Sequence, residues 1–381
     1  MRIISIWRPA DALIHKNSQA LLPLVTYLDP ENPDAKSKDD KDLLPSHTDS
    51  KSESLHYTLS DADESAALQE KTIQTLAGVV RRYNIAHLHV HYLGHPATLA
   101  SLVSQLTNIT FSISAHAKDV YQTAPNQTRQ RLKEATFITT CTQYNVDYLR
   151  TIAPVQQAKI QLINHGIDTT HFCPSKQPKM TGQSDEPPVI LSIGRFKFKK
   201  GLDLLIDACE LLRAQGTNFE CKIVGYGDQE DCLRKQISKK SLEDQIRIYP
   251  PVTENGVRDL LNNTTIFVLP CRIGSDGDRD GIPNAVLEAM ACELPVISTT
   301  VSGIPEIIHS SINGLLVEPD NPTLIAEAIT KVITDKALAQ RLGKAARHTI
   351  CERFDWKTNL RPLTDVLKKA VALSNNLSVT R

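Results

Sequence analysis

Short runs of apolar residues alternate along most of the chain with longer segments in which apolar residues recur every three or four positions. The short runs are typical of buried strands, and the longer segments of helices with one apolar face. Residues 201–214 show the helical spacing, whereas residues 189–193 (VILSI) are almost entirely apolar. Because strands and helices alternate, the pattern predicts an α/β fold with parallel, doubly wound sheets.

The same pattern locates the individual elements. The predicted strands span residues 2–6, 20–28, 86–90, 109–114, 136–141, 159–163, 189–193, 219–224, 246–249, 266–269 and 296–299. The predicted helices span residues 66–83, 96–106, 127–134, 143–150, 201–214, 285–290 and 354–373.

Two polar segments interrupt this alternation. Residues 174–188 (PSKQPKMTGQSDEPP) are rich in Pro, Gly and Ser, which favours a domain linker. Residues 29–54 contain few apolar residues, so we expect them to be disordered. The predicted organisation is a first Rossmann-like domain at residues 1–173, a second at 189–356, and a final helix with a loose tail at 357–381 that crosses back to the first domain. Two such domains would leave a cleft between the carboxyl ends of their strands.

Composition narrows the functional classes. The 381 residues are 41% hydrophobic and 23% charged, with a formal net charge of zero, so overall charge does not point to nucleic acid. No run of eighteen apolar residues is present, and the start MRIISIW lacks the apolar core and cleavage site of a signal peptide. The eight cysteines form no CxxC pair, which favours buried thiols in a reducing cytoplasm over disulfides or zinc ligands.

Two carboxylates flank a loop in the sequence DGIPNAVLE. Gly281 permits close approach of the backbone to a ligand, and Pro283 is expected at the first position of a helix. The free N–H groups and the positive end of that helix suit a diphosphate. Glu288 follows Asn284 by four residues, so both share one helix face, with Asp280 at the other end of the loop.

A basic turn follows the first strand of the second predicted domain, in GRFKFKKG at residues 194–201. Arg195 would clamp a diphosphate with its planar guanidinium, and Lys200 would act as a point charge. The alternative is a solvated basic turn, which is the more plausible description of Lys197 and Lys199.

Two more loops contain glycines at the ends of strands. VGYGD at residues 224–228 either forms a turn or lets the backbone approach a base or ribose, and its residues alone do not decide between the two. SGIPE at residues 302–306 repeats the order of loop, proline and helix start.

Histidines follow or occupy two strands of the first predicted domain. His116 comes directly after a strand, where a structural hydrogen-bond partner is more common than a catalytic group, and Asp119 is a candidate cap for the next segment. A second group has period-two spacing, which places three of its members on one strand face and allows either a zinc site or, more often, interior or cleft-lining residues. Its members are His87, His89, His91 and His95.

The acidic pair and its loops resemble the retaining glycosyltransferases of family 4, which have the GT-B fold of two Rossmann-like domains facing a central cleft. In that family an acidic residue is followed by seven residues and a Glu, and Asp280 stands here where many members have Glu. The DGIPN and SGIPE sequences resemble the branch that builds bacterial exopolysaccharide, colanic-acid-like polymers and lipopolysaccharide. The resemblance is close over residues 188–356 and looser over 87–168. The N-terminal sequence lacks the glycine-containing loop that family members usually carry.

The resemblance implies transfer of a hexose from a nucleoside diphosphate (NDP) sugar to a growing cell-surface polysaccharide or lipid-linked oligosaccharide, without a metal ion or cofactor. It implies that Glu288 binds ribose, Asp280 orients the donor sugar, His116 contacts the reacting sugar, and Arg195 and Lys200 stabilise the leaving diphosphate. Donor contacts are implied for the remaining loop residues Gly194, Gly225, Gly227, Gly281, Ile282, Pro283 and Asn284. Residues 164–168 resemble a structural turn of the family, with Gly166 in the turn and Asp168 as a cap.

The resemblance also implies a cytoplasmic enzyme in peripheral contact with the inner membrane, with a glycan or glycolipid acceptor and no nucleic-acid partner. Arg129, Arg131 and Lys133 would then touch anionic headgroups, although a solvated helix face is the favoured interpretation. Two alternative functions stay open: a catalytically impaired nucleotide-binding partner or sensor, and a sugar-phosphate-using enzyme on the same fold.

Overall fold

The computed structural model describes residues 3–5, 25–27, 62–175 and 186–379. The chain divides into two compact units, residues 1–86 with 99–109, and residues 87–98 with 110–381. The polar segment at residues 29–54 and most of the predicted linker lie outside the described residues. The predicted domain boundaries therefore stay predictions.

The first unit contains a parallel pair of short strands and one long helix. β1 (Ile3–Ser5) pairs with β2 (Val25–Tyr27), so both predicted strands are present in shorter form. α2 (Ala62–Arg82) begins four residues before the predicted helix. Its buried residues Ile73, Ala77 and Val80 recur at intervals of four and three, as one face of a helix requires.

A four-stranded parallel sheet opens the second unit, in the order β3-β4-β5-β6. Its strands are β3 (His87–His91), β4 (Thr110–Ala115), β5 (Ile138–Thr140) and β6 (Ile160–Leu162). The helices that follow along the chain are α3 (His95–Thr107), which is divided between the units, α4 (Ala117–Gln122), α5 (Pro125–Glu134), α6 (Gln143–Ile152) and the 3₁₀ helix η2 (Pro154–Lys159). The predicted alternation over these residues is confirmed, and α4 and η2 were not predicted.

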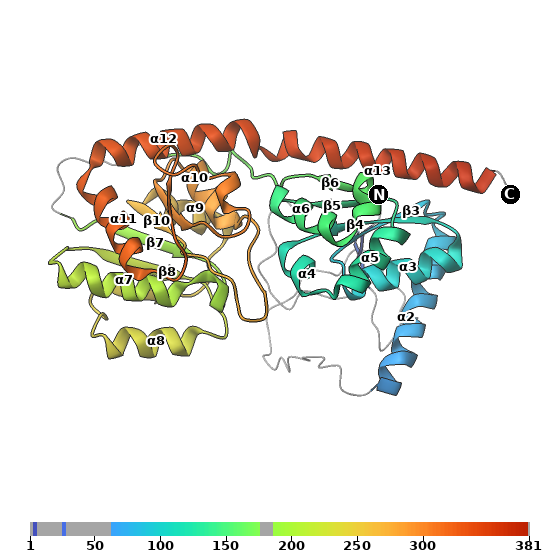
Figure 1. The fold of residues 1–381 in the computed structure, drawn as a ribbon, viewed down its shortest axis with the longest axis horizontal. Coiled ribbons are helices and arrows are strands. Elements are labelled where there is room, and N and C mark those ends of the chain that lie inside the picture. Colours follow the sequence, from blue (N-terminus) through green and yellow to red (C-terminus); the bar gives the residue numbers. More distant parts are fainter. Residues whose placement is uncertain (1–2, 6–24, 28–61, 176–185, 380–381) are drawn as a thin grey trace, which may run out of the picture. The chain divides into compact units, whose positions relative to one another are not determined.

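A six-stranded parallel sheet forms the rest of the second unit, in the order β12-β11-β10-β7-β8-β9. Its strands are β7 (Val189–Ile193), β8 (Glu220–Val224), β9 (Ile246–Tyr249), β10 (Ile266–Val268), β11 (Val296–Thr299) and β12 (Leu315–Val317). Its helices are η3 (Phe198–Lys200), α7 (Leu202–Ala214), α8 (Glu230–Lys239), α9 (Glu254–Asn262), α10 (Asn284–Ala291), η4 (Ile304–Glu306), α11 (Pro322–Thr334) and α12 (Lys336–Arg353). α7 packs on α8 and α11, and α10 packs on α12 at the opposite face of the sheet (Figure 1). Covering both faces explains why the central strands β7 and β10 are almost entirely apolar, whereas β8 and the edge strand β9 alternate polar and apolar residues.

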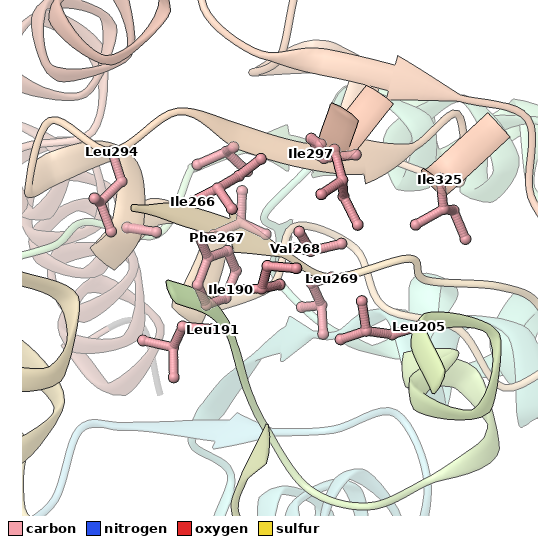
Figure 2. Close-up of a cluster of buried hydrophobic side chains, with 14 of the residues drawn as sticks. Ile190, Leu191, Leu205, Ile266, Phe267, Val268, Leu269, Leu294, Ile297 and Ile325 are labelled. Carbon is pink, nitrogen blue, oxygen red and sulfur yellow. The ribbon is translucent and has the colours of Figure 1, made fainter. Parts of the chain in front are cut away.

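The core of this sheet consists of side chains from neighbouring strands and from the helices above and below them. Figure 2 shows Ile190, Leu191, Phe267 and Ile297 from three adjacent strands, together with Leu205 of α7, and all five are fully buried. Burying one such side chain stabilises the folded state by about 1.5–3 kcal/mol, so this layer of side chains contributes strongly to the stability of the sheet.

Several elements beyond the predicted ones complete the unit. β12, α8, α9, α11 and α12 were not predicted, although α12 buries Leu338, Leu342, Ala346 and Ile350 at regular intervals of four. α13 (Trp356–Val379) contacts β3 and β4 and continues six residues past the predicted end near Leu373. No helix within the described residues is long and apolar enough to cross a membrane.

Candidate functional site

The predicted donor-site residues gather where the strand order of the six-stranded sheet reverses. β7 lies between β8, the next strand in the chain, and β10, which the chain reaches only after two further strands. Loops at the carboxyl ends of such neighbouring strands form the usual ligand site of an open parallel sheet. Here these loops are residues 194–201 after β7 and residues 269–283 after β10.

A compact charge cluster joins the two loops. Nζ of Lys200 lies 2.6 Å from Oδ2 of Asp280, and Nζ of Lys199 lies 3.4 Å from Oδ1 of the same carboxylate and 2.8 Å from Oδ1 of Asp278. The Lys199 side chain is only 6% exposed, so its prediction as a solvated lysine is wrong. The positive charges of two lysines balance the negative charges of two aspartates, which allows the cluster to lie largely out of water.

The pKa shifts within this cluster follow from burial and pairing. Burial alone would raise the pKa of the Asp280 carboxyl, but the ammonium groups of Lys200 and Lys199 outweigh burial and hold that pKa below its usual value. Burial lowers the pKa of Lys200, and the attraction of Asp280 reverses the shift, so the net pKa is raised. Both groups are therefore charged at neutral pH, and Asp280 serves as an anion fixed by two cations.

Two glycines flank the turn that carries the lysines. A Cβ on Gly194 would make only an ordinary van der Waals contact with Cε of Lys200, at 3.5 Å, so the lysine stem does not require a glycine there. Gly201 has φ +64°, and a Cβ there would overlap the carbonyl oxygen of Pro270. Arg272 stabilises the turn through two contacts with Phe198. Its guanidinium stacks 3.5 Å from the Phe198 ring centroid and donates to the Phe198 carbonyl at 3.0 Å.

Arg195 differs from its neighbours in the turn. Its side chain is exposed and has no ion pair or hydrogen bond within the described part of the chain. Its charge acts on Lys200, whose pKa it lowers. A guanidinium without an acidic partner beside a lysine leaves net positive charge for an anionic ligand.

Packing of the backbone explains why the loop after β8 contains two glycines. Gly225 and Gly227 have φ +149° and +155°, and a Cβ on the first would overlap the Gly194 carbonyl oxygen, and on the second the Phe196 carbonyl oxygen. They let the loop after β8 pack directly on the turn after β7, with the Phe196 amide donating to the Tyr226 carbonyl at 2.6 Å. Their predicted donor contact stays a prediction.

The loop of Gly281 to Asn284 leads into α10, as predicted. Pro283 is the residue that caps this helix, and Asn284 is its first residue, so the prediction of Pro283 at the first helical position is wrong by one residue. Ile282 is half-buried against the core and Asn284 is exposed at the helix start. The amides of Val286 and Leu287 donate to the Pro283 carbonyl at 3.0 and 3.4 Å, whereas those of Asn284 and Ala285 have no hydrogen-bond partner within the described residues. The positive end of α10 therefore borders this loop.

Glu288 lies one turn into α10. Its carboxyl has no hydrogen bond or ion pair within the described part of the chain. Burial, with a smaller contribution from the negative charge of Glu254, raises the pKa of Glu288 to about 7. A largely buried carboxyl that no protein group stabilises is suited to accept hydrogen bonds from a ligand.

His116 lies at the carboxyl end of β4 and starts α4. Burial, followed by the charges of His165 and His91, lowers its pKa to about 4, so its imidazole is neutral at physiological pH. Oδ1 of Asp119 accepts from the His116 amide at 2.9 Å and Oδ2 accepts from the Leu93 amide at 2.6 Å, which confirms Asp119 as a cap.

Contacts within the second unit bring Gly281 close to the residues around His116. A Cβ on Gly281 would lie 3.7 Å from Cβ of Ala117, 3.6 Å from Sγ of Cys141 and 3.3 Å from Cγ2 of Thr142. The loop that carries Asp280 therefore lies beside the carboxyl edge of the four-stranded sheet. The structure thus brings these two predicted parts of the site together.

Sequence reasoning did not single out Glu306. Its carboxylate accepts hydrogen bonds from the amides of Gln143 and Tyr144, both at 2.8 Å, at the start of α6. With Thr142 accepting from the Asn145 amide at 3.1 Å, the first amides of α6 are satisfied. No local sequence signal reveals this cap, because it comes from a loop about 160 residues away.

Two of the histidines on β3 form hydrogen bonds with hydroxyl groups of β4. The ring nitrogens of His87 lie 2.7 Å from the hydroxyls of Thr110 and Ser112, and those of His89 lie 2.8 and 2.9 Å from Ser112 and Ser114. His91 differs, because its Nδ1 lies 3.0 Å from Nε2 of His116.

The turn at residues 164–168 is structural, as predicted. A Cβ on Gly166 would overlap Cα of Trp356, so the glycine permits close packing of two backbones. Oδ1 of Asp168 accepts from the amides of Thr170 and His171 at 2.9 and 3.1 Å, which is the predicted cap.

The basic helix α5 does not present all its cations to solvent. Arg131 lies 3.0 Å from the Glu134 carboxylate and donates to the Thr98 hydroxyl at 2.7 Å, with only 13% of its side chain exposed. The prediction that the Arg131 side chain faces either anionic headgroups or solvent is therefore wrong.

Comparisons with known proteins identify a matching family and similar sequences. Residues 175–349 match the family described as "Glycosyl transferases group 1". Similar curated proteins include an amylovoran biosynthesis glycosyltransferase, AmsK, of Erwinia amylovora, which is 34% identical over 211 residues, covering 55% of this chain and 51% of that protein. A putative colanic acid biosynthesis glycosyltransferase, WcaL, of Escherichia coli K12 is 34% identical over 213 residues with the same coverage. The chain thus spans about half the length of the curated relatives it matches.

Solved structures share the fold. A glycosyltransferase from Rickettsia africae aligns with TM-score 0.66 and 20% identity over 82% of this chain and 84% of that one. Anabaena Alr3699/HepE in complex with UDP aligns with TM-score 0.69 and 15% identity over 94% and 90%. At these identities the likeness establishes the fold alone, which is the predicted two-domain α/β architecture named GT-B.

Proposed function

Because residues 175–349 match the group 1 glycosyltransferases, we propose that the chain transfers a hexose from an NDP-hexose to a growing cell-surface polysaccharide or lipid-linked oligosaccharide. The names of its relatives in amylovoran and colanic acid biosynthesis support an exopolysaccharide product. Transfer proceeds with retention of configuration and without a metal ion, at the cytoplasmic face of the membrane. One structural relative, Anabaena Alr3699/HepE, has been solved in complex with UDP-glucose, which supports a nucleotide-sugar donor.

The observation that carries this proposal is the carboxyl of Glu288, which is largely buried and has no partner within the described residues. Two ribose hydroxyls donating to that carboxylate would remove the penalty that burial imposes on its charge. The amides at the start of α10, near Ile282 and Asn284, would face the diphosphate of the same ligand.

The charges after β7 then serve the leaving group. Arg195 has no acidic partner in the described part of the chain, and Lys200 lies next to it. Both would stabilise the negative charge that develops on the nucleoside diphosphate as its bond to the anomeric carbon breaks. Asp280, held by two lysines, is fixed as a hydrogen-bond acceptor for the donor sugar.

His116 contributes from the opposite side of the loop. Its neutral imidazole can accept or donate a hydrogen bond to the sugar without adding charge. The closeness of Gly281 to Ala117, the next residue after His116, puts this side chain near the loop that would hold the donor sugar.

The first experiment measures thermal unfolding with UDP, GDP, ADP and their hexose conjugates, in buffer containing EDTA. A ligand at a hundred times its Kd stabilises the folded state by about 2.7 kcal/mol. We expect a shift with one base, lost in Glu288→Ala. Absence of any shift in the folded protein would refute the donor site.

Turnover is then assayed with the donor identified by that shift. Lys200→Met should lower kcat about a hundred- to a thousandfold, because it removes a cation from the leaving group. Lys197→Met is the matched control, since Lys197 lies in the same turn but pairs with the exposed Asp228 at 2.7 Å. Nucleotide binding without release of nucleotide from any donor would favour the non-catalytic partner or sensor instead.

A further inference from the structure

The four parallel strands of the first sheet each lead to a histidine or cysteine at the same edge. His91 is the last residue of β3, His116 follows β4, Cys141 follows β5, and His165 lies three residues beyond β6. Because β3 to β6 are neighbours in that order, these side chains converge at one edge of the sheet.

Three of them converge closely enough to share an ion. One ligand atom from each of His116, Cys141 and His165 lies within 4.8 Å of the other two. A zinc ion bound to two imidazole nitrogens at about 2.0–2.1 Å and a thiolate at about 2.3 Å would place these atoms about 3.3–3.6 Å apart. Movements of about an ångström therefore suffice to close the site, and the exposed side chain of His165 has room to make them.

We propose that His116, Cys141 and His165 form a binding site for a thiophilic transition-metal ion, with Zn²⁺ as the expected occupant. Imidazole and thiolate together select zinc over the oxygen-seeking cations Mg²⁺ and Ca²⁺. As the zinc–sulfur bond forms, the Cys141 thiol proton passes to solvent, and the fourth position is open to water. The 3.0 Å contact between His91 and His116 places a third imidazole next to the ion, where it would orient the His116 ring.

An ion at this site would stop the proposed sugar transfer rather than assist it. The ion would engage His116, which is the proposed contact to the donor sugar. It would also lie beside Gly281, whose Cβ position is 3.6 Å from Sγ of Cys141. The site therefore predicts reversible inhibition by zinc, which is separate from the metal-independent chemistry proposed above.

The test measures binding directly, so it does not depend on the proposed activity. The full chain, stripped with EDTA and exchanged, is titrated with Zn²⁺ against a chromophoric chelator. We expect one tight equivalent, weakened at least tenfold in Cys141→Ser and in His165→Ala. The exposed Cys232 and Cys351 provide matched controls, and Cys232→Ser and Cys351→Ser should keep the equivalent.

Cobalt substitution identifies the ligands. Co²⁺ in the same chain should give a thiolate-to-metal charge-transfer band that Cys141→Ser abolishes. His165→Ala keeps the test valid if the buried Cys141 variant fails to fold, because His165 is exposed. No tight equivalent, or one that survives both ligand variants, would overturn the proposal.

The inhibition is checked once a donor is known. Zinc should suppress turnover of the wild-type chain, EDTA should restore it, and the His165→Ala variant should be at least tenfold less sensitive. Equal sensitivity of wild type and His165→Ala would overturn the inhibitory role. A chain with no turnover at all would refute the proposed function while leaving the binding result intact.

Discussion

Replacing Glu288 by glutamine should stabilise this protein at neutral pH, although the residue belongs to the proposed donor site. Burial raises the pKa of Glu288 from its ordinary value of 4.5 to about 7 in the folded protein. Each pKa unit corresponds to about 1.4 kcal/mol, so the ionised carboxylate costs the folded state about 3 kcal/mol.

The sign of the pH dependence follows from the direction of that shift. Below pH 4.5 the carboxyl is protonated in both folded and unfolded chains, and it imposes no cost. Between pH 4.5 and about 7 the unfolded chain loses its proton first, so the folded state becomes progressively less favoured. Glutamine is neutral throughout, so Glu288→Gln should gain stability over wild type across this window and keep the gain above pH 7.

The assay is urea unfolding of both proteins without nucleotide, at several pH values from 5 to 8. The free energy of unfolding of the variant minus that of wild type should rise by about 2.5 kcal/mol across the series, because part of the cost is already present at pH 5. Glu327→Gln, on the exposed face of α11, is the matched control and should show no such rise. A difference that is flat with pH would refute the reasoning, because it would mean that the carboxyl is not destabilised by burial.

Nucleotide binding should depend on the same proton. Hydroxyl donors favour the ionised carboxylate, so binding below pH 7 should release a proton. The affinity for the nucleotide should therefore increase from pH 5.5 to 7, and Glu288→Gln should abolish the increase. A pH-independent affinity in the wild type would place the ribose elsewhere.

Three further predictions concern how the site is held. Glu306→Ala removes two 2.8 Å hydrogen bonds and a negative charge from the start of α6, and should lower the free energy of urea unfolding by about 1–2 kcal/mol; an unchanged value would mean that water replaces the cap. Gly201→Ala should cost more than about 2 kcal/mol, because its Cβ would overlap a carbonyl oxygen, whereas Gly216→Ala, with φ +75° and nothing within 4 Å, should cost about 1 kcal/mol; equal losses by thermal unfolding would contradict the packing argument. Lys199→Met should raise the pKa of Asp280 and shift the acidic limb of the pH–rate profile upward, and an unshifted limb would show that Lys200 alone sets that pKa.

Much of this fold was predictable because strands and helices have local periods. The apolar runs of β7 and β11 and the helical spacing of α7 carry their own signals, so their bounds were predicted to within one residue. α8 was missed because it buries only Leu233 and Ile237, too few apolar residues to reveal a period.

The residues of the candidate site could be named from the sequence, but their burial and their pairing could be predicted only in part. Asp280, Lys200 and Glu288 could be named from their loops and spacing, but the pairing of Asp280 with Lys200 could not, because the two lie eighty residues apart. Lys199 illustrates the limit, since its sequence suggested a solvated turn and its burial is decided by Asp278 and Asp280 from another loop.

The sequence by itself determined the alternating elements, the loop chemistry and the family resemblance, because each depends on residues close together in the chain. Only the tertiary structure decided the strand order, the lack of a partner for Glu288 among the described residues, the cap that Glu306 supplies to α6 and the gathering of His116, Cys141 and His165. Burial and pairing depend on residues far apart in sequence that come together only when the sheets pack, and local patterns carry no record of those contacts.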